Sequence, residues 1–540
     1  MKRPILFGTL ATVAAIGVGV LMIPRPTLLR FNDLQVEEYE WKEIISTHKE
    51  NPELNPGRIL FGNIPLQLDA DHNRLFFTIA SDSAASLIPT VSLPREDQIN
   101  MVSRESKLSI GKMSENEPIP VLIFTPQEYR VMDLVVTSLP IMNIDTLGNA
   151  EFDDNDSEAE IQLYSENTAI DSKTLIHLRG STSYFLEKQS FKLSLMKENG
   201  KNNKLQLLDM RADDDWILNS LYGDFEKVRN ILSAQLWKDC CTEHNVDHIP
   251  NSFEYRFVEL FIDNSYNGLY ILGYKPDKKV VDLQDNELTF KNRDWTNAEV
   301  LHTDPNFERY YSVESDTDDE LAAQTELMHF LDILAQGNTD EIRANFDIIN
   351  AIDVELHAML TAETDYAKAG KTKNLYVTIK QRPERRYVLY TPWDFDLSFG
   401  NTWQDGLKNN TSTLSYGATP DIVPESAAMP VPILLANGDT TIRQELKDRY
   451  AELRNGAWSD QNIMGLINNY EAQIFASGAY YRDCERWPLG NFIEGATNLS
   501  KFRDFVEARL KFLDDYYDFL PAEWCFLARS LASENLRISE

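Results

Sequence analysis

The chain has 540 residues, of which 43% are hydrophobic and 11% aromatic, a composition typical of a folded protein and not of a disordered one. Aspartate and glutamate number 85 against 52 lysines and arginines, which gives a net charge of −33. A surface that negative repels phosphate backbones, so the composition argues against nucleic acid as a partner.

An uncharged stretch of 20 residues, 4–23, follows Lys2 and Arg3. As a helix it would span roughly 30 Å, the thickness of the hydrocarbon core of a bilayer. We therefore expect residues 1–23 to be an N-terminal transmembrane helix that acts as a signal anchor. The bulk of the protein would then be extracytoplasmic, in the periplasm or at the cell surface. A cleaved signal peptide, and hence a secreted protein, is the other interpretation.

The rest of the chain divides by its hydrophobic pattern. Residues 24–58 are polar and mixed, and we interpret them as a linker with a short helix around 36–45. Over residues 59–134, stretches such as "PLQLDADHNRLFFTIA" and "IPVLIFTP" predict a small β-rich domain. Residues 135–520 mix predicted strands and helices and end in a mainly helical part, and 521–540 form a tail. The expected fold class is α+β.

The first stretch with candidate chemistry is "LIHLRGSTSYFLEKQSFKLSL", which predicts two strands joined by a turn that contains Gly180 and Ser181. Arg179 ends the first strand, and Lys188 and Lys192 share one face of the second by strand alternation. Backbone N–H groups of such a turn can bind a phosphate, which a lysine on the next strand can also reach. A hairpin with a basic outer face and no ligand is the other interpretation.

A helix is predicted after "TDDE". In this capping box, Thr317 would cap the N-terminus and Glu320 would reach back to it. Gly337 would end the helix, because glycine readily takes the left-handed conformation found at helix C-termini.

The second stretch is "LTAETDYAKAGKTKNLYVTIK". Asp365 falls where a predicted helix gives way to a loop, and Asn374 comes nine residues later at the start of a strand. An aspartate followed by an asparagine is one arrangement by which kinases position a hydroxyl and coordinate magnesium. A polar loop with an Asx turn is the structural interpretation of the same residues.

The third stretch, "YVLYTPWDFDLSFGN", places Asp394 and Asp396 at the end of the partner strand, with Phe395 pointing the opposite way into the core. Magnesium needs only one or two protein carboxylates, because phosphate oxygens and waters complete its octahedron. Together with Asn374, the two aspartates therefore predict a site for Mg²⁺ (or Mn²⁺) and a nucleotide. Alternatively, one of the two caps the turn that follows.

The order of these stretches resembles the CotH family of spore-coat-type atypical protein kinases. The resemblance covers roughly residues 135–520 and rests on "RGSTS…EKQSFKLSL", "LLDMRADDDWILNSLYGDFEKVRNILSAQL", "RFVELFIDNSYNGLYIL" and "WDFDLSFGN". It implies an atypical protein-kinase-like fold that uses ATP and Mg²⁺ (or Mn²⁺) to phosphorylate serine or threonine of extracytoplasmic proteins. The acidic exterior would favour substrates that are basic and serine-rich.

The resemblance also assigns roles to the candidate residues. Asp365 would orient the attacking hydroxyl, and Lys192 would be the phosphate-binding lysine, with Lys188 as its rival on the same face. The rest of the nucleotide site would be formed by Arg179, Gly180 and Ser181. The metal would be held by Asn374, Asp394 and Asp396.

Two further features bear on function. Arg229 and Asn230 match an Arg-Asn pair of the family on a helix, and we expect them to support the lysine strand. After Leu272, residues 273–275 read Gly-Tyr-Lys, whereas the family has a Thr-Glu-type continuation. A second functional class therefore stays open, a non-catalytic cell-surface adhesion or assembly protein on a degenerate kinase-like scaffold.

Overall fold

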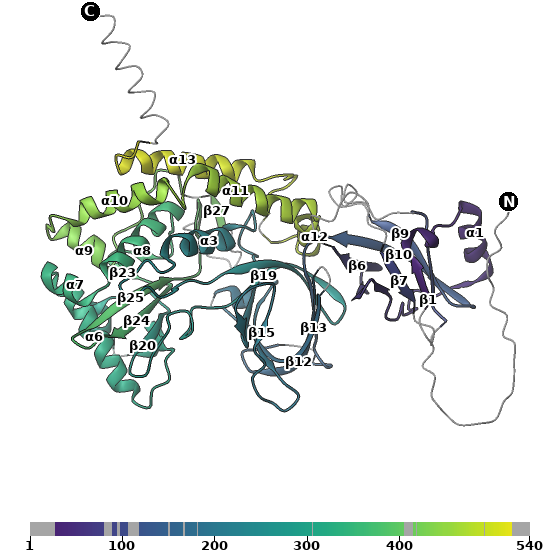
Figure 1. The fold of residues 1–540 in the computed structure, drawn as a ribbon, viewed down its shortest axis with the longest axis horizontal. Helices are drawn as coiled ribbons and strands as arrows, with labels where there is room; N and C mark the ends of the chain where they lie inside the picture. The colour runs from purple at the N-terminus through teal and green to yellow at the C-terminus, as the bar shows by residue number, and fades with distance from the viewer. Residues whose placement is uncertain are drawn as a thin grey trace, which may run out of the picture.

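The computed structural model consists of a β-rich domain, a closed β-barrel and a four-stranded sheet with helices around it (Figure 1). Figure 1 shows the β-rich domain at one end, the barrel in the middle and the four-stranded sheet at the other end. The structure describes residues 27–79, 89–93, 98–105, 118–149, 152–165, 168–180, 182–304, 306–403, 414–416, 418–490 and 492–520.

The α+β class is confirmed, since sheets and helices both build the molecule. The predicted signal anchor and the predicted tail both lie outside the described residues. Within the described ranges, no helix combines the length and the apolar character needed to cross a bilayer.

Two sheets form the β-rich domain. The first has the order β1-β7-β3-β4, and the second has the order β5-β6-β10-β9-β8 with β2 paired to β10. The bounds are β1 Thr27–Arg30, β2 Lys49–Glu50, β3 Leu60–Phe61, β4 Ile64–Pro65, β5 Gln67–Asp69, β6 Arg74–Thr78, β7 Thr90–Leu93, β8 Asn100–Ser103, β9 Ile119–Phe124 and β10 Glu128–Thr137.

The stretch interpreted as a linker belongs to this domain over its described residues. β1 pairs with β7 along its whole length, and Phe31 and Leu34 of the short 3₁₀ helix Phe31–Leu34 are buried in the domain's core. The predicted short helix is present as α1, Glu38–Thr47. The domain also ends later than expected, because β10 runs unbroken to Thr137. The domain begins earlier and ends later than predicted because apolar side chains beyond the predicted boundaries are buried in its core.

Seven strands form the closed barrel, in the order β11-β12-β13-β14-β17-β19-β18, with β11 and β18 pairing in parallel. Their bounds are β11 Ile141–Asp145, β12 Ser157–Ser165, β13 Thr168–Arg179, β14 Ser190–Met196, β17 Asp215–Asn219, β18 Tyr255–Ile262 and β19 Ser265–Gly273. Two short strands, β15 Leu205–Gln206 and β16 Ala212–Asp213, pair with each other.

The barrel and the β-rich domain share a hydrophobic core. Phe76 of β6 stacks on Tyr266 of β19, with ring centroids 5.5 Å apart, and meets Phe261 of β18 edge-on at 5.0 Å. A surface ion pair of 3.3 Å joins Arg74 of the β-rich domain to Glu485, in the helix α12 Ala479–Arg486. Because aromatic side chains bury large apolar areas, the two units stabilise each other.

The third unit is the sheet β21-β20-β24-β25. Its strands are β20 Leu288–Asn292, β21 Tyr311–Val313, β24 Leu375–Gln381 and β25 Arg386–Pro392; the small strands β22 Ala367–Lys368, β23 Lys371–Thr372, β26 Asn401–Trp403 and β27 Leu414–Tyr416 form two separate pairs. The helices are α3 Arg229–Cys241, α4 Ala298–Thr303, α5 Phe307–Tyr310, α6 Glu320–Gln336, α7 Thr339–Asn345, α8 Ile348–Thr361, α9 Pro430–Ala436, α10 Ile442–Arg454, α11 Asp460–Glu471, α12 Ala479–Arg486 and α13 Ser500–Tyr516.

Candidate functional site

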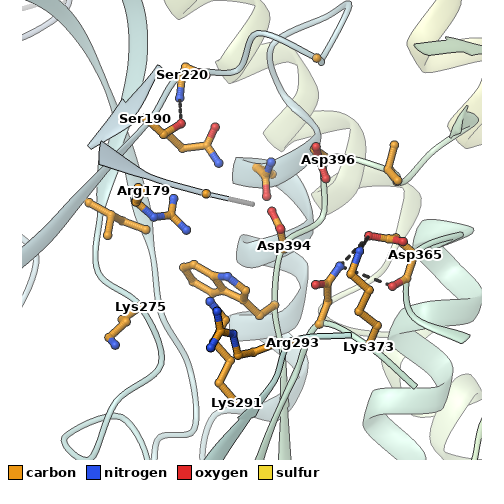
Figure 2. A pocket seen from close by; sticks show the side chains of 18 of the residues that line it. Arg179, Ser190, Ser220, Lys275, Lys291, Arg293, Asp365, Lys373, Asp394 and Asp396 are labelled. Atoms are coloured by element: carbon orange, nitrogen blue, oxygen red, sulfur yellow. Dashed lines mark hydrogen bonds and ion pairs between the residues drawn. The ribbon is translucent and has the colours of Figure 1, made fainter. Parts of the chain in front are cut away.

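A cleft of about 640 Å³ opens between the barrel and one end of the four-stranded sheet (Figure 2). Both units supply its walls, since residues of β13, β14 and β17 face residues of β20, β24 and the loops beside them. The structure brings most of the predicted site residues to this cleft, namely Arg179, Gly180, Lys192, Asp365, Asn374, Asp394 and Asp396.

The antiparallel order of the sheet explains why Asn374 and Asp394 meet. β24 begins directly after Asn374, and β25 ends two residues before Asp394. Because the two strands form an antiparallel hairpin, with Leu375 opposite Pro392, the start of one lies beside the end of the other. A hydrogen bond of 2.9 Å from the N–H of Trp393 to the carbonyl of Asn374 fixes this junction. The predicted hairpin is therefore present.

Two residues of α3 form hydrogen bonds with the loop that carries the two aspartates. Asn230 accepts a hydrogen bond of 2.9 Å from the N–H of Phe395, whose ring is buried as expected. Arg229, itself in contact with Asp224 and Glu226, donates to the carbonyl of Ser398 at 2.9 Å. The Arg-Asn pair thus supports the aspartate loop and not the lysine strand that we expected.

Asp365 lies in the loop after α8, as predicted, and its carboxylate has two donors. Lys373 Nζ and Asn374 Nδ2 each donate to Asp365 Oδ2 at 2.9 Å. The N–H of Asp365 donates to Glu363 Oε1 at 3.0 Å. These bonds fix the orientation of the carboxylate toward the cleft that it lines (Figure 2).

Negative charge is concentrated at this end of the cleft. Burial, followed by the charges of Asp394 and Asp365, raises the pKa of Asp396 well above its ordinary value. Burial also raises the pKa of Asp365, although Lys373 opposes this, and raises the pKa of Glu363 to about 8. Among the described residues, Asp365 has Lys373 as a partner, whereas the main influences on the pKa of Asp396 and Glu363 include no compensating cation.

These residues fit a divalent cation. Within the part of the chain that the structure describes, no three histidine, cysteine, aspartate or glutamate side chains surround a common metal position. Magnesium, however, uses one or two protein carboxylates and takes its other oxygens from phosphates and water. Asp394 and Asp396, with the amide oxygen of Asn374, form such a donor set, and a cation there would relieve the repulsion around Asp396.

The barrel supplies the basic wall of the cleft. Lys192 of β14 lies 3.5 Å from Asp215 of β17, and its side chain is 31% exposed. Arg179, at the end of β13, places its guanidinium 5.8 Å from the centre of the Trp393 ring. Gly180 follows with a φ of 119°, which side chains disfavour. Ser181, which we expected beside it, lies outside the described residues.

Lys188 is not part of the cleft, and the prediction that it shares a face with Lys192 is wrong. Its ammonium is completely buried and donates to Asp483 of α12 and to the carbonyl of Leu269, both at 2.6 Å. The physical reason is that β14 begins only at Ser190, so strand alternation does not extend back to Lys188.

A second basic group, which the sequence pattern did not predict, lies in the cleft. Lys275, Lys291 and Arg293 line the cleft, as do the aromatic residues Tyr376 and Trp393. Lys275 pairs with Glu314 at 2.7 Å. The alternation of Lys291 and Arg293 in "FKNR" at the end of β20 was the available signal, but the pairing of β20 with β24 is not local in sequence.

Comparison with known proteins relates most of the barrel and of the helical part, and the whole four-stranded sheet, to one protein family. A protein-family model described as CotH kinase protein matches residues 176–513, which include the basic wall, the aspartate loop and the helical part. A search among curated proteins found no match.

Proposed function

Because the chain belongs to the CotH kinase family, we propose that it transfers the γ-phosphate of ATP to serine or threonine residues of extracytoplasmic proteins. One observation carries the proposal. Asp365, Asp394 and Asp396 share a cleft with the basic residues of the barrel wall, although they come from different segments of the chain. Phosphoryl transfer requires this combination of a base, a cation site and positive charge for the phosphates.

Each group has a role in this reaction. Asp394, Asp396 and Asn374 would hold Mg²⁺ or Mn²⁺, which when bound neutralises charge on the phosphates. Asp365 would accept the proton of the attacking hydroxyl, with its carboxylate held by Lys373. The acceptor oxygen forms a bond to the γ-phosphorus while the bond to the bridging oxygen breaks, and ADP leaves.

Transfer of labelled phosphate from ATP to basic, serine-rich peptides, with Mg²⁺ or Mn²⁺, tests the proposal. We expect the Asp365→Asn variant to lose about 10²–10⁴-fold in kcat, the usual contribution of a general base. Asparagine retains the oxygen that accepts from Lys373 and Asn374, so the fold should persist, as a thermal melt can verify. Equal rates for the variant and the wild type would refute this role of Asp365.

We also propose that residues 4–23 anchor the protein in a membrane and that the acidic exterior recruits basic substrates. Support comes from the uncharged length of this segment and from the net charge of −33. Protease digestion of spheroplasts, from which the outer layers of the cell have been removed, tests the topology. Loss of the protein from intact spheroplasts agrees with an extracytoplasmic location, and protection until the spheroplasts are lysed contradicts it.

A second candidate is a non-catalytic adhesion or assembly protein. The Gly-Tyr-Lys sequence at 273–275 favours it, since it departs from the family's pattern and places Lys275 in the cleft, paired with Glu314. A thermal shift with ATP and Mn²⁺ separates the two functions. Stabilisation by the nucleotide favours the kinase, whereas an unchanged melting temperature favours the scaffold.

A further inference from the structure

Lys291 lies at the same end of the sheet as Asn374, on the neighbouring strand. β20 ends at Asn292, whose carbonyl accepts from the N–H of Asn374 at 3.2 Å. Figure 2 shows Lys291 and Arg293 together on one side of the cleft, with Arg179 nearby, whereas Asp365 and Asp396 lie on the other side. The cleft thus has a basic side and an acidic side.

Three groups on the basic side have no acceptor within the part of the chain that the structure describes. Among the described residues, Lys291 takes part in no hydrogen bond or ion pair, and the contact we find for Arg179 is with the ring of Trp393. Tyr376, directly opposite Lys291 in the strand ladder, is only 1% exposed, and its hydroxyl has no hydrogen-bond partner among the residues described. Within the described ranges, three residues that line the cleft therefore carry hydrogen-bond donors without an acceptor.

Electrostatics agrees with this geometry. Burial, followed by repulsion from Arg179, lowers the pKa of Lys291 to about 8, while Asp394 acts in the opposite direction. Two cations that repel each other in a cleft are stabilised when an anion lies between them. Both sides line the same cleft of about 640 Å³, so one ligand can contact both.

We propose that Lys291, Arg179 and the hydroxyl of Tyr376 form a phosphate seat. In this arrangement, which rests on the proposed function, the phosphate chain of the nucleotide runs from the cation held by Asp394 toward Lys291. Lys291 thereby becomes a second phosphate-binding lysine, supplied by the sheet and not by the barrel. Because adenosine carries no phosphate, the seat would strengthen the binding of ATP and of tripolyphosphate but not that of adenosine.

Calorimetric titration of the full-length protein tests the seat. The ligands are ATP, tripolyphosphate and adenosine, each with Mg²⁺, and the variants are Lys291→Met and Lys291→Arg. We expect Lys291→Met to weaken ATP and tripolyphosphate binding by about 10- to 100-fold, the range for a charged hydrogen bond, with adenosine unaffected. Lys291→Arg should retain most of the affinity. The matched control is Lys278→Met, since Lys278 is a half-exposed lysine outside the cleft.

The outcomes separate the seat from the kinase activity. The proposed seat is refuted if the wild type does not bind tripolyphosphate or if Lys291→Met binds it with unchanged affinity. The seat is likewise refuted if the substitution weakens adenosine binding by the same factor as ATP binding. It is also wrong if a phosphoserine peptide, and not ATP, depends on Lys291. If tripolyphosphate binding requires Lys291 but no phosphate is transferred to any protein, the seat stands and the proposed function fails.

Discussion

Lys188 and Lys192 have very different surroundings, although they are only four positions apart in the sequence. Lys188 is fully buried in an ion pair with Asp483, whereas the pair of Lys192 with Asp215 is open to solvent, with side chains 31% and 42% exposed. Removing one partner of a buried pair leaves an uncompensated charge, but a solvent-exposed pair contributes little. The two lysines should therefore affect different properties of the protein.

We expect Lys188→Met to lower the free energy of unfolding by about 3 kcal/mol, the lower end of the range for a broken buried pair, because Lys227 still lies 3.5 Å from Asp483. ATP affinity should stay unchanged in the folded protein. Lys192→Met should change stability by less than about 1 kcal/mol but weaken ATP binding. Urea denaturation and calorimetry measure the two effects. Weakened ATP binding by Lys188→Met at normal stability would show that Lys188 acts in the cleft after all.

The low pKa of Lys291 predicts a pH dependence. Burial is the largest effect and lowers the pKa of its ammonium; Arg179 and Lys275 lower it further, whereas Asp394 and Glu314 raise it, so that the pKa is about 8. Below about pH 8 the lysine is charged and attracts phosphate, and above it the free protein must first take up a proton to bind. ATP affinity should therefore fall as the pH rises through about 8.

Titrations at several pH values check this expectation. Lys291→Arg is the control, because arginine stays charged over this range and should remove the decline. A decline of the same size in the arginine variant would assign the pH dependence to another group.

At the scale of single elements, the N-terminus of α6 differs from the predicted one. Asp319 and not Thr317 caps the helix, since its side chain accepts from the N–H of Ala322 at 2.9 Å. Thr317 accepts only from the N–H of Asp319, at 3.2 Å. The end of the helix at Gly337 is confirmed, with a φ of 69°. All five residues from Ser315 to Asp319 are of types that can cap a helix, so the sequence pattern alone did not distinguish them.

The cap gives a direct prediction for stability. Asp319→Ala should cost about 1 kcal/mol, the usual value for an N-cap, whereas Thr317→Ala should cost only a few tenths. Urea denaturation of both variants compares them. A larger loss from Thr317→Ala would support the capping box expected from the sequence.

The candidate site shows which functional residues can be predicted from the sequence and which cannot. Asn374, Asp394 and Asp396 could be found because each lies where a strongly patterned strand begins or ends, and a hairpin joins those strands locally. Lys291 could not, because its place in the cleft depends on pairing between β20 and β24, which are more than 80 residues apart. The role of Asn230 likewise depends on a contact between a helix and a distant loop.

At the scale of the whole molecule, the β-rich domain is not independent of the barrel. Its boundaries were misplaced because short strands such as β1 carry too few residues for a pattern, and their burial depends on distant partners. Phe76 belongs to a core that includes Phe261 and Tyr266 of the barrel. We therefore expect both units to unfold together.

Phe76→Ala tests this coupling. The variant should lose about 3–5 kcal/mol and still unfold in one transition, seen equally by tryptophan fluorescence and far-UV circular dichroism. Leu28→Ala is the control within the same domain, because Leu28 is 66% exposed and should change stability by less than about 0.5 kcal/mol. Two separate transitions would contradict the shared core.

Binding of Mn²⁺-ATP to the Asp394→Asn variant tests the central claim most directly. Asp394 has a φ of 68°, a conformation that asparagine also tolerates, so the substitution removes the charge while preserving the loop. If the cleft binds a nucleotide through a cation on this carboxylate, calorimetry should show at least about tenfold weaker binding than to the wild type. Equal affinities would contradict the account.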